Sequence, residues 1–348
     1  MKSFLRPPDS KRQSLATALF LLLLMWAGDG CPAVAQAFTL VELNCENLFD
    51  TCHDYGRQDT EYLPGAVRHW NRGRYWRKQN HTAQAILSCA IDEGIPDLVA
   101  LCEVENDSVV RDLTRRSLLR QAKYDYLTTT SPDLRGIDVA LLYSPFTFGL
   151  LSSYALRVAP VEGMRPTRDI LYAKGVTNTG AADTLHVFVV HLPSRFGGER
   201  YSRPFRQAAV SRLCQAIDSI QALTPEANIL IAGDFNDEPG SPLIGQILDR
   251  RLCNVTAKAA GANGVRGTYR YKGAWNRIDH ILASRRLASL ADTAFIQAPL
   301  FLLEEDTTYG GYKPRRTYNG MRYQPGYSDH LPLVARFRWG KRPIPSKK

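Results

Sequence analysis

The sequence predicts an α/β sandwich that contains antiparallel strands. Seven runs of β-branched and apolar residues each end in polar residues, and several are apolar at every position, as in strands covered on both faces. Two amphipathic helical segments lie between these runs, but strands and helices do not alternate strictly, which argues against a fully parallel sheet. The runs are FTLVELNCEN, DLVALCEVEN, DVALLYS, LHVFVVHLPS, NILIAGDFND, RIDHILAS and LPLVARFRW.

Two segments have the periodicity of helices that cover a sheet with one face. In residues 77–94 the apolar positions recur every three or four residues, and Gly94 followed by Pro96 predicts the end of that helix. In residues 203–223 one apolar stripe contains Ala209, Leu213 and Ile217.

The N-terminus is predicted to be a secretory signal peptide over residues 1–37. Lys11 and Arg12 precede the short apolar run SLATALFLLLLMWAG, and the small residues Ala35 and Ala37 offer cleavage sites. A lipid anchor on Cys31 is the weaker alternative, because Asp29 suits a lipidation site poorly. No later segment approaches 18 consecutive apolar residues, so we expect a mature protein without a transmembrane segment, secreted or held in the periplasm or cell envelope.

One domain is expected over residues 38–340, followed by a basic tail over 341–348. Loss of residues 1–37 takes away four basic and two acidic side chains, so the formal net charge falls from +10 to +8. A basic surface attracts polyanions such as nucleic acid or anionic lipid head groups. Six cysteines remain; buried free thiols are expected at Cys45 and Cys102, and a Cys45–Cys52 disulfide is an alternative.

Polar side chains that can take part in catalysis fall where the apolar runs end. A carboxylate buried without compensation is costly, so an acid at the end of a strand either caps a loop or belongs to a site. A single aspartate in GDFND is typical of a turn, and a single histidine in a strand is typical of a core. As a set at matching strand ends, they favour a common site. The candidates are Asn44, Glu46, Glu103, His191, Asp234, Asn236, Asp279, Asp329 and His330.

This set of side chains has the chemistry of a site for a hard cation. Mg²⁺ prefers oxygen ligands, accepts one or two carboxylates with waters, and leaves room for phosphate oxygens. Glu46 and Glu103 are the first candidates for direct ligands, and Mn²⁺ could serve in place of Mg²⁺. Such an ion would polarise a phosphoryl oxygen and offset the charge that develops during hydrolysis of a phosphate ester.

The motifs around these residues resemble those of the endonuclease/exonuclease/phosphatase superfamily, whose fold is that of deoxyribonuclease I and the abasic-site endonucleases. The resemblance implies a four-layer α/β/β/α sandwich with the active site at one edge, between the two sheets, here in a secreted bacterial member. It covers nearly all of the mature chain and rests on NCENLFD, CEVEN, RGIDVALLY, VVHLPSRFGG, AGDFND, RIDHIL and GYSDHLPL.

The same resemblance implies roles for the individual residues. His191 contacts the scissile phosphate and helps the leaving oxygen, Asp234 orients or deprotonates the attacking water, and Asn236 lies beside it on the phosphate. Asp279 holds the tautomer of His330, and whether Asp234 or His330 takes the proton of the water stays open. Asn44 and Glu103 position the metal and the phosphate, with Glu46 and Asp329 as further metal ligands.

Two basic segments flank these motifs. Arg135, which precedes Gly136, could reach a substrate phosphate or could be only exposed. The segment KPRRTYNGMRY places Arg315, Arg316 and Arg322 among tyrosines, which suits the rim of a site for an anionic substrate as well as a solvated loop.

Three functions compete for this sequence. The first is a secreted, Mg²⁺-dependent phosphodiesterase that acts on nucleic acid, supported by the complete motif set and the basic charge. The second is a phosphoesterase for a lipid or a small phosphate, of the sphingomyelinase or inositol-phosphatase kind, because the catalytic residues recognise only the phosphate. The third, a non-catalytic binding protein, is disfavoured because no position of the motif set is lost. No stable protein partner is implied, and the sequence leaves the number of metal ions and the oligomeric state open.

Overall fold

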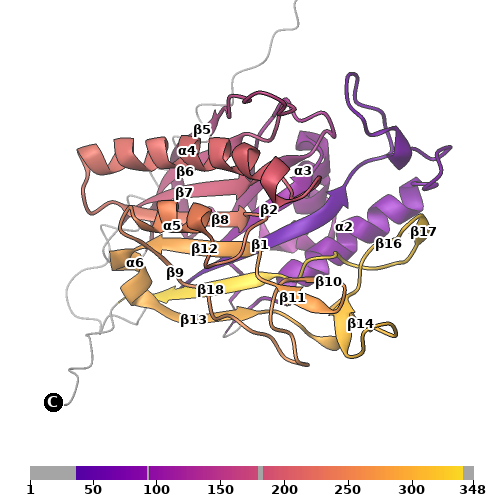
Figure 1. The fold of residues 1–348 in the computed structure, drawn as a ribbon. Coiled ribbons are helices and arrows are strands. Elements are labelled where there is room, and N and C mark those ends of the chain that lie inside the picture. Colours follow the sequence, from indigo (N-terminus) through magenta and orange to yellow (C-terminus); the bar gives the residue numbers. More distant parts are fainter. Residues whose placement is uncertain (1–36, 92–93, 179–182, 340–348) are drawn as a thin grey trace, which may run out of the picture.

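Two six-stranded sheets pack face to face in the computed structural model, which describes residues 37–91, 94–178 and 183–339 (Figure 1). The predicted signal peptide, Cys31 and the basic tail lie outside the described residues, apart from Ala37, which begins the first strand. None of the helices in the described part of the chain is long and apolar enough to cross a bilayer.

The first sheet joins the two ends of the described chain. Its strand β1 runs parallel to β2 and antiparallel to β18, and β2 runs antiparallel to β4. In spatial order the strands are β13 (Ala291–Ile296), β18 (Leu333–Arg338), β1 (Ala37–Leu48), β2 (Leu98–Val104), β4 (Asp138–Tyr143) and β3 (Asp125–Thr128).

The second sheet is built from the middle of the sequence and also combines one parallel pair with antiparallel neighbours. Strands β7 and β8 are parallel, while β12 runs antiparallel to β8 on its other side. The spatial order is β5 (Phe148–Leu156), β6 (Ile170–Thr177), β7 (Thr184–His191), β8 (Asn228–Asp234), β12 (Asp279–Ser284) and β9 (Leu252–Asn254).

Helices cover the outer faces of both sheets, which gives the predicted four layers (Figure 1). Helices α4 (Glu199–Leu223) and α5 (Pro242–Leu248) pack on the second sheet, and α2 (Arg72–Leu87) and α3 (Asp107–Arg115) pack on the first. The remaining elements are short: helix α6 (Arg285–Leu290); the hairpins β10 (Tyr269–Tyr271) with β11 (Ala274–Asn276), β14 (Leu303–Glu305) with β15 (Tyr312–Pro314), and β16 (Tyr318–Asn319) with β17 (Arg322–Tyr323); and the 3₁₀ turns Thr60–Tyr62, Leu118–Ala122 and Leu300–Leu302.

Strand β8 shows why the sequence is apolar at every position of a central strand. Ile229 and Ile231 pack toward α4 and α5, whereas Leu230 and Ala232 belong to the core between the sheets. Successive side chains of a strand point to opposite faces, so both faces need apolar residues. The same alternation carries the next residue of the inner face, Asp234, to the seam between the two sheets.

The predicted helices are confirmed, with shifted bounds. Helix α2 begins earlier than expected, because the Asn71 side chain accepts a hydrogen bond from the Arg74 amide at 3.1 Å and caps it. It also ends earlier, at Leu87, because Ile91 and Gly94 hydrogen-bond to each other across a tight turn. Helix α4 extends the expected segment by four residues toward its N-terminus.

The cysteines of the described residues are free thiols. Cys45 and Cys102 are fully buried in β1 and β2, as predicted, and Cys52 is exposed, so the alternative Cys45–Cys52 disulfide is not formed. Burial raises the pKa of the Cys45 thiol to about 12, which keeps it protonated and unreactive near neutral pH.

Candidate active site

Asp234 lies at the centre of the candidate site because of the strand register. As the last residue of β8, it is paired with His191 of β7 on one side and with Asp279 of β12 on the other. Gly233 permits this arrangement: its φ is +150°, and a Cβ atom there would lie 1.8 Å from the carbonyl oxygen of Val190. Three predicted site residues from distant parts of the sequence therefore meet at one edge of the second sheet.

His330 completes this group from the first sheet. Its Nδ1 lies 2.8 Å from Oδ2 of Asp279, and the Thr268 hydroxyl donates to the same carboxylate oxygen. Potential ligand atoms of Asp234, Asp279 and His330 all lie within 4.8 Å of one another. The Asp279 carboxylate fixes which ring nitrogen of His330 faces the other groups, so Nε2 is directed away from Asp279.

The side chains of Asn44, in β1, and His191, in β7, both approach the carboxylate of Asp234. The Asn44 amide donates to Oδ2 of Asp234 at 3.2 Å, and Nε2 of His191 lies 3.6 Å from the same oxygen. Asn236 is fixed beside them, because its backbone amide donates to Oδ1 of Asp234 at 2.8 Å and its side chain donates to the Leu192 carbonyl at 3.0 Å. Amide and imidazole nitrogens therefore surround the carboxylate of Asp234.

Glu103 faces this group from a bulge in β2. The register between β1 and β2, and between β2 and β4, shifts at this point, and one carboxylate oxygen of Glu103 lies 4.0 Å from Nε2 of His191. Its other oxygen accepts a hydrogen bond from the Asn47 amide at 3.0 Å. Arg135 lies 3.5 Å from Glu103 and donates to the Asn47 side chain at 2.7 Å, so this arginine borders the site and remains half exposed.

Glu46 and Asp329 form a second acidic group that is neutralised by basic side chains of the protein itself. Arg316 bridges the two carboxylates at 3.3 and 2.8 Å, and the Lys78 ammonium lies 3.6 Å from Glu46. The Thr317 amide also donates to Glu46 at 2.6 Å. Burial and the charge of Asp329 raise the pKa of Glu46, whereas Lys78 and Arg316 oppose that rise.

The backbone is strained at several residues of the site. Glu46, Asn47, Glu103 and Asn236 have φ angles between 49° and 60°, a region that few residues with a side chain occupy. Such conformations cost about 1–3 kcal/mol each and persist where the surrounding structure enforces them. The strain follows from the bulges of β1 and β2, which turn Glu46 and Glu103 out of the regular alternation.

Burial and neighbouring charges shift the protonation of the central residues. Burial and the charge of Asp279 raise the pKa of Asp234 to about 7. Burial alone would lower the pKa of His330, but the adjacent Asp279 carboxylate outweighs it, so the net direction is upward. Burial, together with Arg168 and Arg135, lowers the pKa of His191 well below its usual range, so His191 is neutral. The site thus holds one cationic and one neutral imidazole around a carboxyl group that titrates near neutral pH.

The donor set fits a divalent cation. Asp279 Oδ1 is buried without a hydrogen-bond partner among the described residues. Burial and the charge of Asp279 raise the pKa of Asp234, and a nearby cation would offset both effects. Of the predicted metal ligands, Glu103 lies beside this group, 4.0 Å from Nε2 of His191. Glu46 and Asp329 would reach the same ion only after Arg316 releases them.

The nine predicted acids, amides and histidines lie along one seam between the sheets, in two connected groups, and Arg135 borders them. Asn44, Glu103, His191, Asp234, Asn236, Asp279 and His330 form the central group, and Glu46 with Asp329 forms the neighbouring one. The groups are joined through Asn44, whose side-chain oxygen accepts a hydrogen bond from the Glu46 amide at 3.0 Å. The catalytic, substrate-binding and metal-binding roles assigned to them stay predictions.

Several residues of the site were not found from the sequence. Glu42 is fully buried, neither of its carboxylate oxygens has a hydrogen-bond partner among the described residues, and burial raises its pKa well above the usual range. A signal existed, because a glutamate within the apolar run FTLVEL has no solvated face. Lys78 lies within a helix and carried no such signal; its ammonium donates to Thr317 and to the Tyr327 carbonyl at 2.8 and 2.5 Å.

Comparison with protein families decides the assignment. A model described as the endonuclease/exonuclease/phosphatase family matches residues 39–338. The chain belongs to this family. Its members hydrolyse phosphoric esters and generally depend on a divalent metal ion, so the chain is a phosphoric ester hydrolase. No curated protein sequence matches the chain significantly.

Several solved structures share the fold of this chain at low sequence identity. An endonuclease/exonuclease/phosphatase family protein from Bacteroides thetaiotaomicron aligns with 89% of this chain and 100% of its own, at 14% identity and a TM-score of 0.59. The human Nocturnin catalytic domain with bound sulfate aligns with 87% of this chain and 96% of its own, at 18% identity and a TM-score of 0.52. A mannosyl-6-phosphatase from Bacteroides thetaiotaomicron aligns with 86% of this chain and 98% of its own, at 15% identity and a TM-score of 0.52. These neighbours support the fold of this phosphoesterase.

The affinity of this phosphoesterase for Mg²⁺ is expected to increase as the pH rises from 5 and to level off above pH 7. The pKa of Asp234 in the metal-free protein is raised to about 7, so its carboxylate is protonated below that pH and charged above it, and a cation binds the charged form more tightly. Titration calorimetry with Mg²⁺ at several pH values measures this. Asp234→Asn should flatten the dependence, whereas Asp249→Asn at an exposed helix end should keep it; equal pH dependence in the two variants would refute the role of Asp234.

Proposed function

We propose that this phosphoesterase is a divalent-metal-dependent phosphodiesterase whose main substrate class is nucleic acid. The observation that carries the proposal is the meeting of Asn44, His191 and Asp234 with the Asp279–His330 pair at one sheet edge. An oriented imidazole, a carboxyl group that titrates near neutral pH and amide donors are the groups that hydrolysis of a phosphodiester requires.

The protonation state of each residue suggests its role in hydrolysis. Neutral His191 and the Asn44 and Asn236 amides can hydrogen-bond the non-bridging oxygens of the phosphate. Asp234 can orient the attacking water or take its proton. His330, held by Asp279, can give a proton to the leaving oxygen or, once neutral, act as the base in place of Asp234. The two assignments predict different pH profiles for Asp234→Asn and His330→Ala.

We propose Mg²⁺, or Mn²⁺, as the ion, with Glu103 as its first ligand and with Glu46 and Asp329 as further ligands. Bound there, the ion supplies Lewis-acid polarisation of a phosphoryl oxygen and stabilises developing negative charge. Carboxylate oxygens are the ligands that Mg²⁺ prefers. Arg316, which pairs with Glu46 and Asp329, would then be free to contact the substrate phosphate.

The basic character of the chain supports a polyanionic substrate. Without the predicted signal peptide the formal net charge is +8, and Arg135 and Arg316 border the catalytic residues from two sides. A phosphatase or phosphodiesterase acting on a lipid or small phosphate is the second candidate, because the described catalytic contacts recognise the phosphate alone. The fold neighbour named as a mannosyl-6-phosphatase gives this candidate its support. Secretion, or retention in the periplasm or envelope, is part of the proposal and depends on the predicted signal peptide.

A panel of substrates tests this proposal. The purified mature protein is incubated with Mg²⁺ and single-stranded DNA, RNA, sphingomyelin, inositol phosphates or mannose 6-phosphate, each at two salt concentrations. Hydrolysis of nucleic acid is expected to be fastest and to fall steeply with salt, because cationic side chains release counterions when they bind a polyanion. Faster hydrolysis of a small phosphate, with little dependence on salt, would replace the proposal by the second candidate.

A further inference from the structure

A separate pocket opens beside the catalytic residues. Its volume is about 270 Å³, and its walls come from the loop around Asp133, from residues 163–168, and from residues 193–205 after β7. His191 ends β7, so the loop that forms one wall begins two residues after a predicted catalytic histidine. Arg135 lines the pocket and also lies 3.5 Å from Glu103, which connects the pocket to the site.

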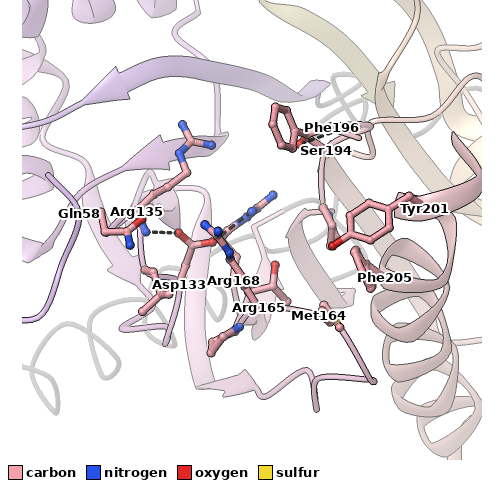
Figure 2. A pocket seen from close by; sticks show the side chains of 15 residues that line it. Gln58, Asp133, Arg135, Met164, Arg165, Arg168, Ser194, Phe196, Tyr201 and Phe205 are labelled. Carbon is pink, nitrogen blue, oxygen red and sulfur yellow. Dashed lines mark hydrogen bonds and ion pairs between the residues drawn. The ribbon is translucent and has the colours of Figure 1, made fainter. Parts of the chain in front are cut away.

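The pocket has two walls of different chemistry. Figure 2 shows Arg135, Arg165 and Arg168 gathered on one side and the aromatic rings of Phe196, Tyr201 and Phe205 on the other. Asp133 is the one acidic residue of the lining, so the lining carries an excess of positive charge.

The arginines of the pocket are held to different degrees. Arg168 is buried and fixed: it lies 3.2 Å from Asp133 and donates to the Leu192 carbonyl at 2.7 Å. Arg165 is exposed and makes no hydrogen bond or ion pair with any part of the chain that the structure describes. Arg168 is therefore engaged by the protein itself, whereas the guanidinium of Arg165 is available to a ligand.

The aromatic wall is open to solvent. The Phe196 side chain is 87% exposed and Tyr201 is 56% exposed, although both are large apolar rings that proteins usually cover. Phe196 is followed by Gly197 and Gly198, which have φ angles of 80° and 92° and turn the loop toward the start of α4. Exposed rings opposite a cationic wall form the combination with which proteins bind the base and phosphate of a single strand.

We propose that this pocket holds one unpaired nucleotide next to the scissile phosphate, with its base on Phe196 and Tyr201 and its flanking phosphate at Arg165. This inference rests on the proposed nuclease function and defines its substrate as single-stranded. The volume of about 270 Å³ is slightly below that of ordinary ligand pockets, which begin at about 300 Å³, and so has room for no more than one nucleotide. A base that is paired within a duplex has no free face for the rings.

Two exposed side chains make a direct test with little risk to the fold. Phe196→Ala and Arg165→Ala are compared with Tyr271→Ala and Arg111→Ala, which remove an exposed ring and an exposed charge outside the pocket. The binding of a fluorescent single-stranded thymidine trinucleotide is measured by anisotropy in the presence of a chelator, so that the result does not depend on turnover. Hydrolysis of the same trinucleotide and of methyl p-nitrophenyl phosphate is measured with Mg²⁺.

Phe196→Ala is expected to weaken binding of the trinucleotide by about ten-fold, which is within the range for one stacked base, and Arg165→Ala is expected to weaken it through loss of a phosphate contact. Arg165→Ala should also lower the slope of log K against log salt by about 0.7, the value for one phosphate contact on a single strand. The control variants should bind like the wild type, and all four should hydrolyse methyl p-nitrophenyl phosphate within two-fold of it.

Three results would overturn the pocket assignment. The first is binding of the trinucleotide by Phe196→Ala and Arg165→Ala that equals the wild type, the second is no binding by the wild type, and the third is an equal loss for a duplex. The proposed function fails separately, if the wild type hydrolyses neither diester in Mg²⁺. The binding assay tests the pocket assignment whether or not the protein hydrolyses these diesters.

Discussion

Chelation of divalent metal ions is expected to reduce phosphodiester hydrolysis to the background rate, and Mg²⁺ or Mn²⁺ is expected to restore it. An anionic phosphate must approach Asp234 and Glu103, two carboxylates that lie close to His191. Without a cation the substrate and the carboxylates repel each other, and the low dielectric of a buried site strengthens that repulsion. The measurement is the initial rate in chelator, followed by titration with each ion.

The Glu103→Gln variant tests whether Glu103 is a ligand of the metal ion. Loss of one carboxylate ligand should raise the Mg²⁺ concentration for half-maximal activity by at least about 10–100-fold, the loss typical of residues that only hold a ligand in place, with activity partly recovered at high Mg²⁺. Glu304→Gln in the β14 hairpin is the matched control and should behave like the wild type. Undiminished hydrolysis in chelator would contradict the metal requirement, and an unchanged Mg²⁺ titration of Glu103→Gln would contradict the ligand assignment.

The His330→Ala variant is expected to lose activity by about 10²–10⁴-fold, the usual contribution of a positioned acid or base. The imidazole is buried, and its Nδ1 lies 2.8 Å from Asp279, so the substitution removes a group whose orientation and proton are both set by the site. Asp279→Asn should cost less than His330→Ala, because the imidazole remains while its orientation and raised pKa are lost. The measurement is kcat and kcat/KM for each variant in saturating Mg²⁺.

Folding must be separated from catalysis in this comparison. His186→Gln replaces a histidine at the other end of β7, where the ring contacts the Tyr172 hydroxyl and not the catalytic group. It should keep its activity within about two-fold, while circular dichroism and Tm report the folding of all three variants. A folded His330→Ala variant with near-normal kcat would remove His330 from the catalytic residues.

The fold could be predicted because the pattern of the sequence is determined locally. The run NILIAGD is apolar at consecutive positions because both faces of β8 are covered, and the stripe of α4 repeats with the helical period because one face packs on the sheet. The helix bounds were less accurate. The Asn71 cap and the turn between Ile91 and Gly94 depend on specific side chains and hydrogen bonds, which periodicity does not record.

The site could be predicted in composition but not in charge balance. Residues such as Asp234, Asp279 and His330 were singled out because each interrupts an apolar run at its end. The neutralisation of Glu46 and Asp329 by Arg316 was not foreseen, because Arg316 lies 270 residues after Glu46. A long-range ion pair leaves no periodic trace in the sequence, since each partner alone is an ordinary polar residue.

The sequence by itself determined the strands and helices of this protein, the motifs through which it resembles its family and the residue types at its strand ends, because burial and backbone periodicity act over a few neighbouring residues. The tertiary structure alone decided which of those ends meet. The placement of β8 between β7 and β12 brings Asp234 beside His191 and Asp279, and it also sets the pKa of Asp234 to about 7. A pKa shift of this kind depends on burial and on distances through space between charged groups, and these are defined only in the folded chain.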